Sequence, residues 1–372
     1  MISFNKPYLT GKETDYIRLA VESGHISGNG MFTKKCQAFF EEKYGFKKAL
    51  LTTSCTDALE MCALLLDIQP GDEVIIPSYT FVSTALAFVR QGAKIVFADS
   101  RSDHPGIDED KIEELITPRT KVIVPVHYAG VACDMDKIMD IANRHSLFVV
   151  EDAAQAIDSY YKGKPLGSIG HLAAFSFHET KNINSGEGGL LAINDDRFVK
   201  RAEIIWEKGT NRAEFFRGEV NKYGWVDTGS SFLPAEIIAA YLWAQLENLD
   251  YIQQKRKNIW EQYNNGLKNW GEKTGISLPV LPAYSTNNGH LFYLVCNSNK
   301  QRSALIQHLR TNEIEAVFHY LSLHQSNYYH KKHDGRKLPN ANRYSDCLVR
   351  LPLFFSLTDE ELLQVIEVII NF

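Results

Sequence analysis

Leu147-Phe148-Val149-Val150-Glu151-Asp152-Ala153-Ala154-Gln155 is the stretch that decides the fold of this chain. The run from Leu147 to Glu151 has the length of a strand and lacks the alternation of a half-exposed one, which is typical of strands that helices cover on both faces. Asp152 follows this run directly. Because ligands bind at the carboxyl ends of the strands in open α/β sheets, we expect Asp152 to lie in a functional site.

Similar short β-branched runs recur between helical patterns through the first half of the chain: Ala49–Thr53, Glu73–Ile76, Lys94–Ala98, Lys121–Val126, Ala174–Phe177 and Leu190–Ile193. Such spacing is typical of βαβ units. It predicts an α/β fold in which helices cover a mainly parallel central sheet.

The length of 372 residues favours one large domain and a smaller one. From Ala235 onward, apolar residues recur every three to four positions, which predicts one long amphipathic helix. They are Ile238, Leu242, Leu246, Leu249, Ile252, Ile259, Tyr263 and Leu267. We expect a large domain over residues 1–249 and a small C-terminal α/β domain over 250–372, with the N-terminal segment a candidate to pack on the small one.

Composition and charge exclude several classes of protein. Hydrophobic residues make up 44% of the chain and charged residues 23%, and the net charge is −5, so we expect no nucleic-acid partner. The N-terminus lacks an apolar leader and no apolar stretch reaches the length of a membrane span, so we expect a cytosolic protein without a membrane partner. The six cysteines form no C-x-x-C pair and are expected to be reduced thiols, and we expect no metal site.

A single lysine stands out downstream of Asp152. Lys181 lies in Ala173-Ala174-Phe175-Ser176-Phe177-His178-Glu179-Thr180-Lys181-Asn182 and is followed by Gly186-Glu187-Gly188-Gly189. A lysine amine can hold an aldehyde cofactor covalently, and an aspartate at the end of a buried strand can keep a pyridine nitrogen protonated. Together, in this order and spacing, the two residues predict a pyridoxal 5′-phosphate (PLP) site in which Lys181 and Asp152 are catalytic.

The turn Thr53-Ser54-Cys55-Thr56-Asp57 has two interpretations. It is either an ordinary helix N-cap by Ser54 or Thr56, or a phosphate site in which Cys55, Thr56 and Asp57 contribute free backbone N–H groups. Near Lys181 and Asp152 the phosphate site is favoured. Three further side chains are candidate cofactor contacts: Ser176 to the phosphate, Phe81 to the face of the pyridine ring and Gln155 to its phenolic oxygen.

Across nearly its whole length the chain resembles the sugar aminotransferases of the DegT/DnrJ/EryC1/StrS family. The matching segments are 71–81, 125–130, 151–155, 176–181 and 186–189. The resemblance implies the aspartate-aminotransferase-like (type I) PLP fold. It also implies a homodimer in which each active site is completed by the second subunit.

Three segments are similar to a subgroup that makes a 4-amino sugar nucleotide for cell-surface polysaccharide: 178–182, 207–212 and 317–320. The implied reaction transfers the amino group of L-glutamate to dTDP-4-keto-6-deoxyglucose and gives dTDP-4-amino-4,6-dideoxygalactose. The gluco epimer, or a 3-amino sugar from a 3-keto substrate, remain alternatives. A sugar dehydratase of the same family would carry histidine in place of Lys181, and a non-catalytic regulator would have lost Asp152, Ser176 or Lys181.

One departure concerns a contact across the dimer. Many family members carry a Gly-Tyr-Asn-Tyr-Arg-like stretch whose asparagine reaches the PLP phosphate of the other subunit, whereas this chain has Gly229-Ser230-Ser231-Phe232-Leu233. Ser231 is the candidate replacement.

Two groups of residues are candidate contacts to the substrates. Lys208, Asn211 and Arg212 are suited to a diphosphate because arginine offers two parallel donors, although a solvated loop would have the same composition. His319, Tyr320 and His324 match a short family segment near the substrate, and structural hydrogen bonding is the alternative.

Overall fold

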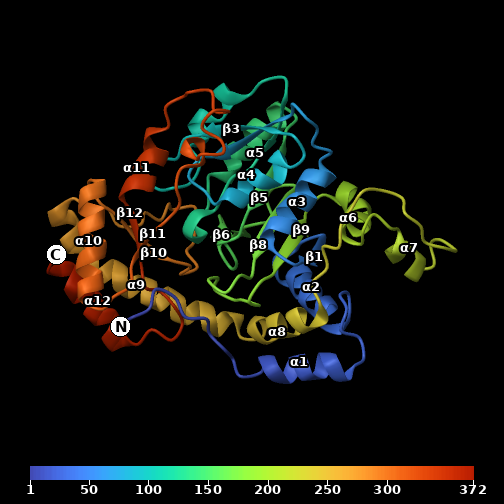
Figure 1. Cartoon of the computed structure of the whole chain (residues 1–372), viewed down its shortest axis with the longest axis horizontal. Coiled ribbons are helices and arrows are strands. Elements are labelled where there is room, and N and C mark those ends of the chain that lie inside the picture. The colour runs from blue at the N-terminus through green and yellow to red at the C-terminus, as the bar shows by residue number, and fades with distance from the viewer.

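A seven-stranded sheet organises the first half of the chain, which the computed structural model describes from residue 1 to residue 372 (Figure 1). The strand order is β1-β9-β8-β5-β4-β2-β3. The strands are β1 (Lys48–Thr52), β2 (Glu73–Pro77), β3 (Lys94–Ala98), β4 (Thr120–Ile123), β5 (Phe148–Asp152), β8 (Leu172–Ser176) and β9 (Gly189–Ile193). Each predicted strand is therefore present, with its ends shifted by at most three residues.

Pairing in this sheet is mainly parallel, as predicted. The strands β8, β5, β4, β2 and β3 run parallel to one another, and β9 alone runs against both β1 and β8. Because β1 and β8 both run against β9, they point the same way. The carboxyl ends of β1, β2, β5 and β8 therefore lie along one edge of the sheet.

Helices cover both faces of the large sheet. One face packs against α3 (Cys55–Leu65), α4 (Val82–Val89) and α6 (Val199–Trp206) in a cluster of 41 buried residues. The other packs against α2 (Met31–Tyr44), α5 (Met135–Arg144) and α8 (Glu236–Leu246) in a cluster of 40. In β5, Val150 points to the first cluster and Val149 to the second, so the strand is buried on both sides and needs no polar face.

The C-terminal part builds a third buried cluster, of 23 residues, around a three-stranded sheet of order β10-β12-β11. Its elements are β10 (Phe292–Val295), β11 (Val317–Phe318), β12 (Leu348–Leu351), α10 (Asn299–Thr311), α11 (Pro339–Cys347) and α12 (Asp359–Ile370). Ile2 belongs to this core and pairs with Ile314, so the start of the chain lies on the C-terminal part. The boundary between residues 249 and 250 stays a prediction.

The single long helix predicted from Ala235 is wrong, since the structure has two helices end to end, α8 and α9 (Leu249–Thr274) (Figure 1). The break falls at Asn248, whose backbone has φ −111° and ψ 10° and whose side chain donates to the carbonyl of Ala244. The apolar period continues through the break because both helices bury a face along the same side of the molecule.

The remaining elements lie outside the seven-stranded and three-stranded sheets. They are the helices α1 (Glu13–Glu22) and α7 (Arg212–Phe216) and the two-stranded sheet of β6 (Tyr160–Tyr161) and β7 (Lys164–Pro165). Figure 1 shows α7 on a segment that projects from the body of the protein. All six cysteines are free thiols. None of the helices combines the length and apolar character that crossing a bilayer requires.

Candidate active site

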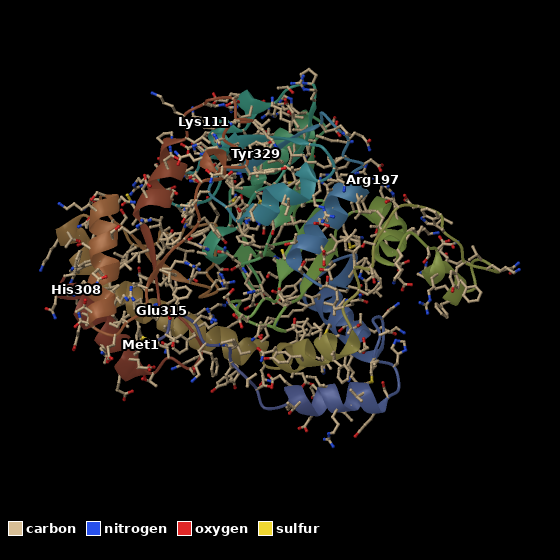
Figure 2. All side chains as sticks on the ribbon, in the orientation of Figure 1. Met1, Lys111, Arg197, His308, Glu315 and Tyr329 are labelled. Carbon is tan, nitrogen blue, oxygen red and sulfur yellow. The ribbon has the colours of Figure 1, made fainter.

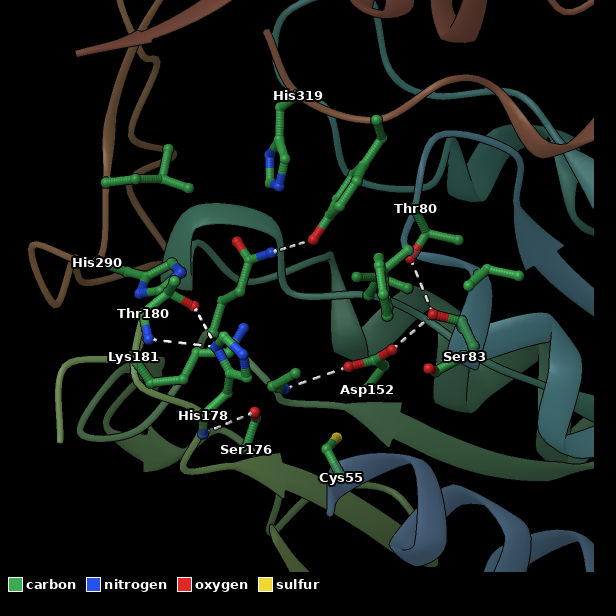
Figure 3. Close-up of a pocket in the computed structure, with 18 of the residues that line it drawn as sticks. Cys55, Thr80, Ser83, Asp152, Ser176, His178, Thr180, Lys181, His290 and His319 are labelled. Atoms are coloured by element: carbon green, nitrogen blue, oxygen red, sulfur yellow. Dashed lines mark hydrogen bonds between the residues drawn. The ribbon is translucent and has the colours of Figure 1, made fainter. Parts of the chain in front are cut away.

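A cavity of about 1030 Å³ opens at the carboxyl edge of the large sheet. Its walls come from the first turns of α3 and α4, from the ends of β5 and β8, and from the small sheet through residues 318–321 and 350–353. Figure 3 shows Asp152, Ser176, Lys181 and Cys55 converging on this space from the end of β5, from the end of β8 and the loop after it, and from the start of α3. The edge that the sequence predicted to be functional is thus the edge that carries the cavity.

Lys181 lies in the loop after β8, where its backbone N–H donates to the carbonyl of His178. Its side chain is partly exposed to the cavity, and Nζ makes neither a hydrogen bond nor an ion pair. Burial lowers the pKa of Lys181, although the nearby Cys55 and Asp152 partly oppose this shift. A larger fraction of the amine is therefore neutral near pH 7, which is the form that acts as a nucleophile or a base.

Asp152 ends β5 and is held on both sides. Its backbone N–H donates to the carbonyl of Pro125, and its own carbonyl accepts from the N–H of His127. The carboxylate accepts at Oδ2 from the hydroxyl of Thr84 (2.7 Å) and at Oδ1 from the N–H of Ala154 (3.2 Å). Burial raises the pKa of Asp152, while the Thr84 and Ala154 hydrogen bonds oppose the rise by stabilising the charged form.

The N-terminus of α3 forms the floor of the cavity. Ser54 is the N-cap, since its hydroxyl accepts from the N–H of Asp57 (3.1 Å), and Cys55 and Thr56 line the cavity. Gly189 packs directly against the backbone of Ser54 and Cys55, and a Cβ there would collide with both. The Gly-Glu-Gly-Gly stretch thus lets β9 pass close beneath the helix start, where free backbone N–H groups and the helix dipole favour an anion.

An aromatic wall closes the opposite side. The ring of Tyr320 is tilted by 31° against that of His319, with centroids 3.5 Å apart, and its centroid lies 6.0 Å from that of Phe81. Gln155 donates to the Tyr320 hydroxyl (3.1 Å) and accepts from the N–H of Ala129 (2.6 Å). Phe81 is 55% exposed, so it is available to a ligand and is not core packing.

The structure therefore brings most predicted site residues to one cavity. Those that line it are Cys55, Thr56, Phe81, Asp152, Gln155, Ser176, Lys181, His319 and Tyr320. Six predicted residues do not line it. The backbone N–H of Asp57 is not free, since it donates to the hydroxyl of Ser54, and its carboxylate accepts from the hydroxyl of Thr53. His324 lies 2.6 Å from the hydroxyl of Ser78.

The other four lie on the segment around α7. Lys208 and Arg212 are exposed, and the Arg212 guanidinium lies over the ring of Phe216. Asn211 accepts from the N–H of Gly224, and Ser231 is exposed where the backbone pairs with Glu207. Within one subunit these four residues do not reach the cavity.

Some residues of the cavity were missed by sequence analysis. Both Thr84 and Ser83 follow β2. The hydroxyl of Thr84 donates to Asp152, and the hydroxyls of Ser83 and Thr56 lie 2.8 Å apart and share a hydrogen bond. The cluster of hydroxyl residues after a predicted strand was a usable signal for both. His290 and Arg350 come from the small sheet and its approach, where no local pattern marks them.

The residues present fit PLP. The unpaired amine of Lys181 can anchor the cofactor covalently, and the free N–H groups at the start of α3 can bind its phosphate. The buried carboxylate of Asp152 can pair with its pyridine nitrogen. All three groups line one cavity, as PLP requires. This donor set defines the class of PLP-dependent transferases.

The chain belongs to the DegT/DnrJ/EryC1/StrS aminotransferase family, whose model matches residues 7–370. It is a PLP-dependent sugar aminotransferase, and its fold is the aspartate-aminotransferase-like type I PLP fold.

Relatives of known sequence and structure agree with this assignment. The chain is 33% identical over 377 residues to the spore coat polysaccharide biosynthesis protein SpsC of Bacillus subtilis, covering 99% of this chain and 96% of the relative. It is similar to Spr1654 of Streptococcus pneumoniae, assigned as a sugar aminotransferase and solved in its PMP form, with 27% identity, a TM-score of 0.92 and coverage of 100% and 98%. It is also similar to the aminotransferase TlmJ of Streptoalloteichus hindustanus, with 28% identity, a TM-score of 0.91 and the same coverage.

Proposed function

We propose that this enzyme transfers the amino group of L-glutamate to C4 of dTDP-4-keto-6-deoxyglucose, giving 2-oxoglutarate and dTDP-4-amino-4,6-dideoxygalactose. The observation that carries amino transfer is the unpaired Lys181 amine, which shares one cavity with the buried Asp152 carboxylate. A dehydratase of this family would have histidine at that position. The sugar is proposed from the likeness of segments 178–182, 207–212 and 317–320 to dTDP-4-amino-4,6-dideoxygalactose transaminase.

Each residue has a proposed role in this reaction. When bound, PLP would supply an electron sink and carry the amino group between the two substrates. Lys181 anchors it and then takes the proton from the α-carbon of the amino donor, a role typically worth about 10²–10⁴ in rate. Asp152 keeps the pyridine nitrogen protonated.

The other contacts position the reacting groups. The Cys55 and Thr56 backbone N–H groups, with the Ser176 hydroxyl, hold the phosphate at the start of α3. Phe81 covers one face of the ring and Gln155 contacts its phenolic oxygen. His319 and Tyr320 contact the sugar or the donor, because they are the polar groups of the aromatic wall that remain inside the cavity.

A homodimer with shared active sites is part of the proposal. The segment around α7 carries large apolar side chains that its own subunit leaves uncovered: Phe216 (69% exposed), Tyr223 (53%), Trp225 (84%) and Val226 (56%). Exposure of this cluster of apolar side chains to water does not stabilise a monomer. A second copy of the chain would bury the cluster in a dimer interface. This segment also carries Lys208, Arg212 and Ser231, so docking would deliver them to the partner's cavity.

The product distinguishes this proposal from its alternatives. The purified enzyme is incubated with PLP, L-glutamate and dTDP-4-keto-6-deoxyglucose, and the ring couplings of the product are read by NMR. A small coupling between H3 and H4 identifies the galacto amine. A large coupling identifies the gluco epimer, and amination at C3 requires the 3-keto isomer as substrate. We propose that the product enters a cell-surface polysaccharide.

A further inference from the structure

A chain of buried amide groups fixes the orientation of Asn182, the residue that follows Lys181. The side-chain nitrogen of Asn182 donates to Oε1 of Gln253 (2.8 Å) and to the carbonyl of Asn288 (2.8 Å). Gln253 is itself oriented, because its side-chain nitrogen donates to the carbonyl of Ile157 (3.2 Å). Both hydrogens of the Asn182 amide are therefore used, and its oxygen Oδ1 is left to accept a hydrogen bond.

The group that meets this oxygen is His290, whose Nδ1 lies 2.8 Å from Oδ1 of Asn182. An amide oxygen can only accept, so Nδ1 of His290 carries a hydrogen. Burial lowers the pKa of His290 well below its usual value, and three positive charges lower it further: Lys181, Arg256 and Arg350. The ring is therefore neutral with a single N–H, and its other nitrogen, Nε2, is a hydrogen-bond acceptor.

This acceptor is open to the cavity. His290 lines the cavity, and its Nε2 has no partner within the protein although it is not sealed from solvent. Figure 3 shows His290 on the side of the cavity where Lys181 lies. The backbone is held as well, since the N–H of His290 donates to Oδ1 of Asn288 (3.0 Å). An unpaired acceptor in a partly buried site favours a ligand that donates a hydrogen.

The contact between Asn182 and His290 joins the loop after β8 to the C-terminal part of the chain, and a second contact holds the two parts together. The hydroxyl of Tyr329 accepts from the N–H of Ile95 on β3 (2.6 Å). Figure 2 shows Tyr329 in the region where Figure 1 shows β3. His290 is therefore a fixed part of the cavity wall, and the direction of its acceptor is fixed with it.

Two ligand groups of the proposed reaction could donate to this nitrogen: a sugar hydroxyl and the ammonium of the amino acid. The charges of Lys181 and Arg350 near His290 disfavour an ammonium, whereas they tolerate a neutral hydroxyl. When C4 of the sugar lies at the amine of Lys181, its neighbours are C3, which carries a hydroxyl, and C5, which carries a methyl group. The C3 hydroxyl is therefore the donor closest to the reacting carbon.

We propose that Nε2 of His290 accepts a hydrogen bond from the C3 hydroxyl of the keto sugar, and that Asn182 positions the ring for this contact. This role rests on the proposed aminotransferase reaction and adds to it a residue that selects the sugar. A site built to accept from a hydroxyl discriminates against an analogue that lacks it, because the acceptor is then left unpaired.

Nitrogen NMR of the PLP-loaded enzyme tests the state of the ring. With isotope-labelled histidine, the wild type should show His290 as a neutral ring with its hydrogen on Nδ1, and the spectrum of His290→Phe identifies that signal. Asn182→Ala should lose this preference, because the acceptor that holds the Nδ1 hydrogen is gone. Asn184→Ala is the matched control and should keep the wild-type signal. Asn184 is also buried in the loop after β8, but it accepts from the N–H of Gly186 and does not line the cavity.

Calorimetry with two unreactive ligands tests the hydroxyl contact. One is dTDP-6-deoxygalactose, which lacks the keto group and the amine, and the other is its 3-deoxy analogue, which also lacks the C3 hydroxyl. The wild type should bind the first about 10-fold more tightly than the second, as expected for one hydrogen bond. His290→Phe should bind the two equally, and His290→Gln, which keeps an acceptor, should retain part of the preference. The affinity for PLP should stay the same in both variants.

The outcomes separate this role from the proposed function. If the wild type bound neither sugar nucleotide, the proposed substrate would be wrong and the role of His290 would fall with it. If the wild type bound both equally, or if His290→Phe kept the full preference, the His290 contact alone would be wrong, and turnover of the keto sugar would still support the proposed reaction. A wild-type ring with its hydrogen on Nε2 would also overturn the contact, since it leaves no acceptor in the cavity. An unchanged signal in Asn182→Ala would overturn the positioning by Asn182.

Discussion

Thr84 donates its hydroxyl to Oδ2 of Asp152 at 2.7 Å and so joins the first turn of α4 to the end of β5. The Thr84 hydroxyl also lies 2.9 Å from that of Thr80, which completes a short buried chain of hydroxyl groups behind the carboxylate. Burial pushes the pKa of Asp152 up, and the hydrogen bond from Thr84 pushes it down. The hydrogen bond from Thr84 therefore favours the ionised form of this buried carboxylate.

Thr84→Val should therefore move the acid limb of the activity profile to higher pH. A hydrogen bond to the charged form lowers a pKa, so its removal raises the pKa of Asp152 further, and the carboxylate is lost at a higher pH as the solution is acidified. The measurement is the pH dependence of the half-reaction with glutamate, followed by visible absorbance. Thr84→Ser should restore the wild-type limb. An unchanged limb in Thr84→Val would remove Thr84 from this role.

Asp152→Asn should leave the fold and PLP binding largely intact but slow both half-reactions. Asparagine keeps the shape of the side chain and can still contact Thr84, but it cannot hold the pyridine nitrogen protonated. We expect a loss of about 10²–10³ in rate, the range for one preorganised electrostatic contact. Single-turnover rates with each substrate check this, with circular dichroism and PLP titration as controls. Near-normal turnover would show that Asp152 has another function.

How far the sequence predicts this site depends on where the residues lie along the chain. Asp152 and Ser176 each end a strand of the parallel part, and Cys55 follows β1, which points the same way at the edge of the sheet. A rule about strand ends therefore places the three residues together without knowledge of the tertiary structure. Arg350 and His290 belong to the small sheet and its approach. Their place in the cavity depends on how that sheet packs on the large one, which no local pattern encodes.

The basic residues around α7 illustrate the opposite case. Lys208 and Arg212 have the composition of an anion site, yet in one subunit they are exposed and outside the cavity. A sequence pattern shows which residue types are present, but it does not show whether their neighbours belong to the same subunit or to a second one. The break at Asn248 has a similar cause, since two helices that share one buried face keep a continuous apolar period.

Arg212→Ala should raise the KM for the sugar nucleotide and leave the kinetics with glutamate unchanged. Loss of one charge-assisted contact to a phosphate costs about 1.5–3 kcal/mol. Steady-state kinetics with each substrate varied in turn check this expectation. If both substrates were weakened equally, the loop around Arg212 would be structural.

Mixing two variants locates this contact in the dimer. If Arg212 acts in the partner's site, hybrids of Lys181→Ala and Arg212→Ala subunits carry both changes in one site and leave the other intact. After exchange of subunits at equal amounts, about a quarter of the wild-type activity should appear at low sugar nucleotide concentration. No recovery would place Arg212 in the site of its own subunit.

The central claim is that Lys181 is the covalent anchor of the cofactor, and borohydride reduction of the PLP-loaded enzyme followed by peptide mapping tests it most directly. The account predicts that the pyridoxyl group is found on Lys181, whose amine is unpaired in the cavity, and that Lys181→Ala loses both the label and turnover. The lysines Lys162, Lys164 and Lys208 are exposed and serve as internal controls. A pyridoxyl group on any of them, with Lys181 unlabelled, would contradict the assignment of the active site and the mechanism built on it.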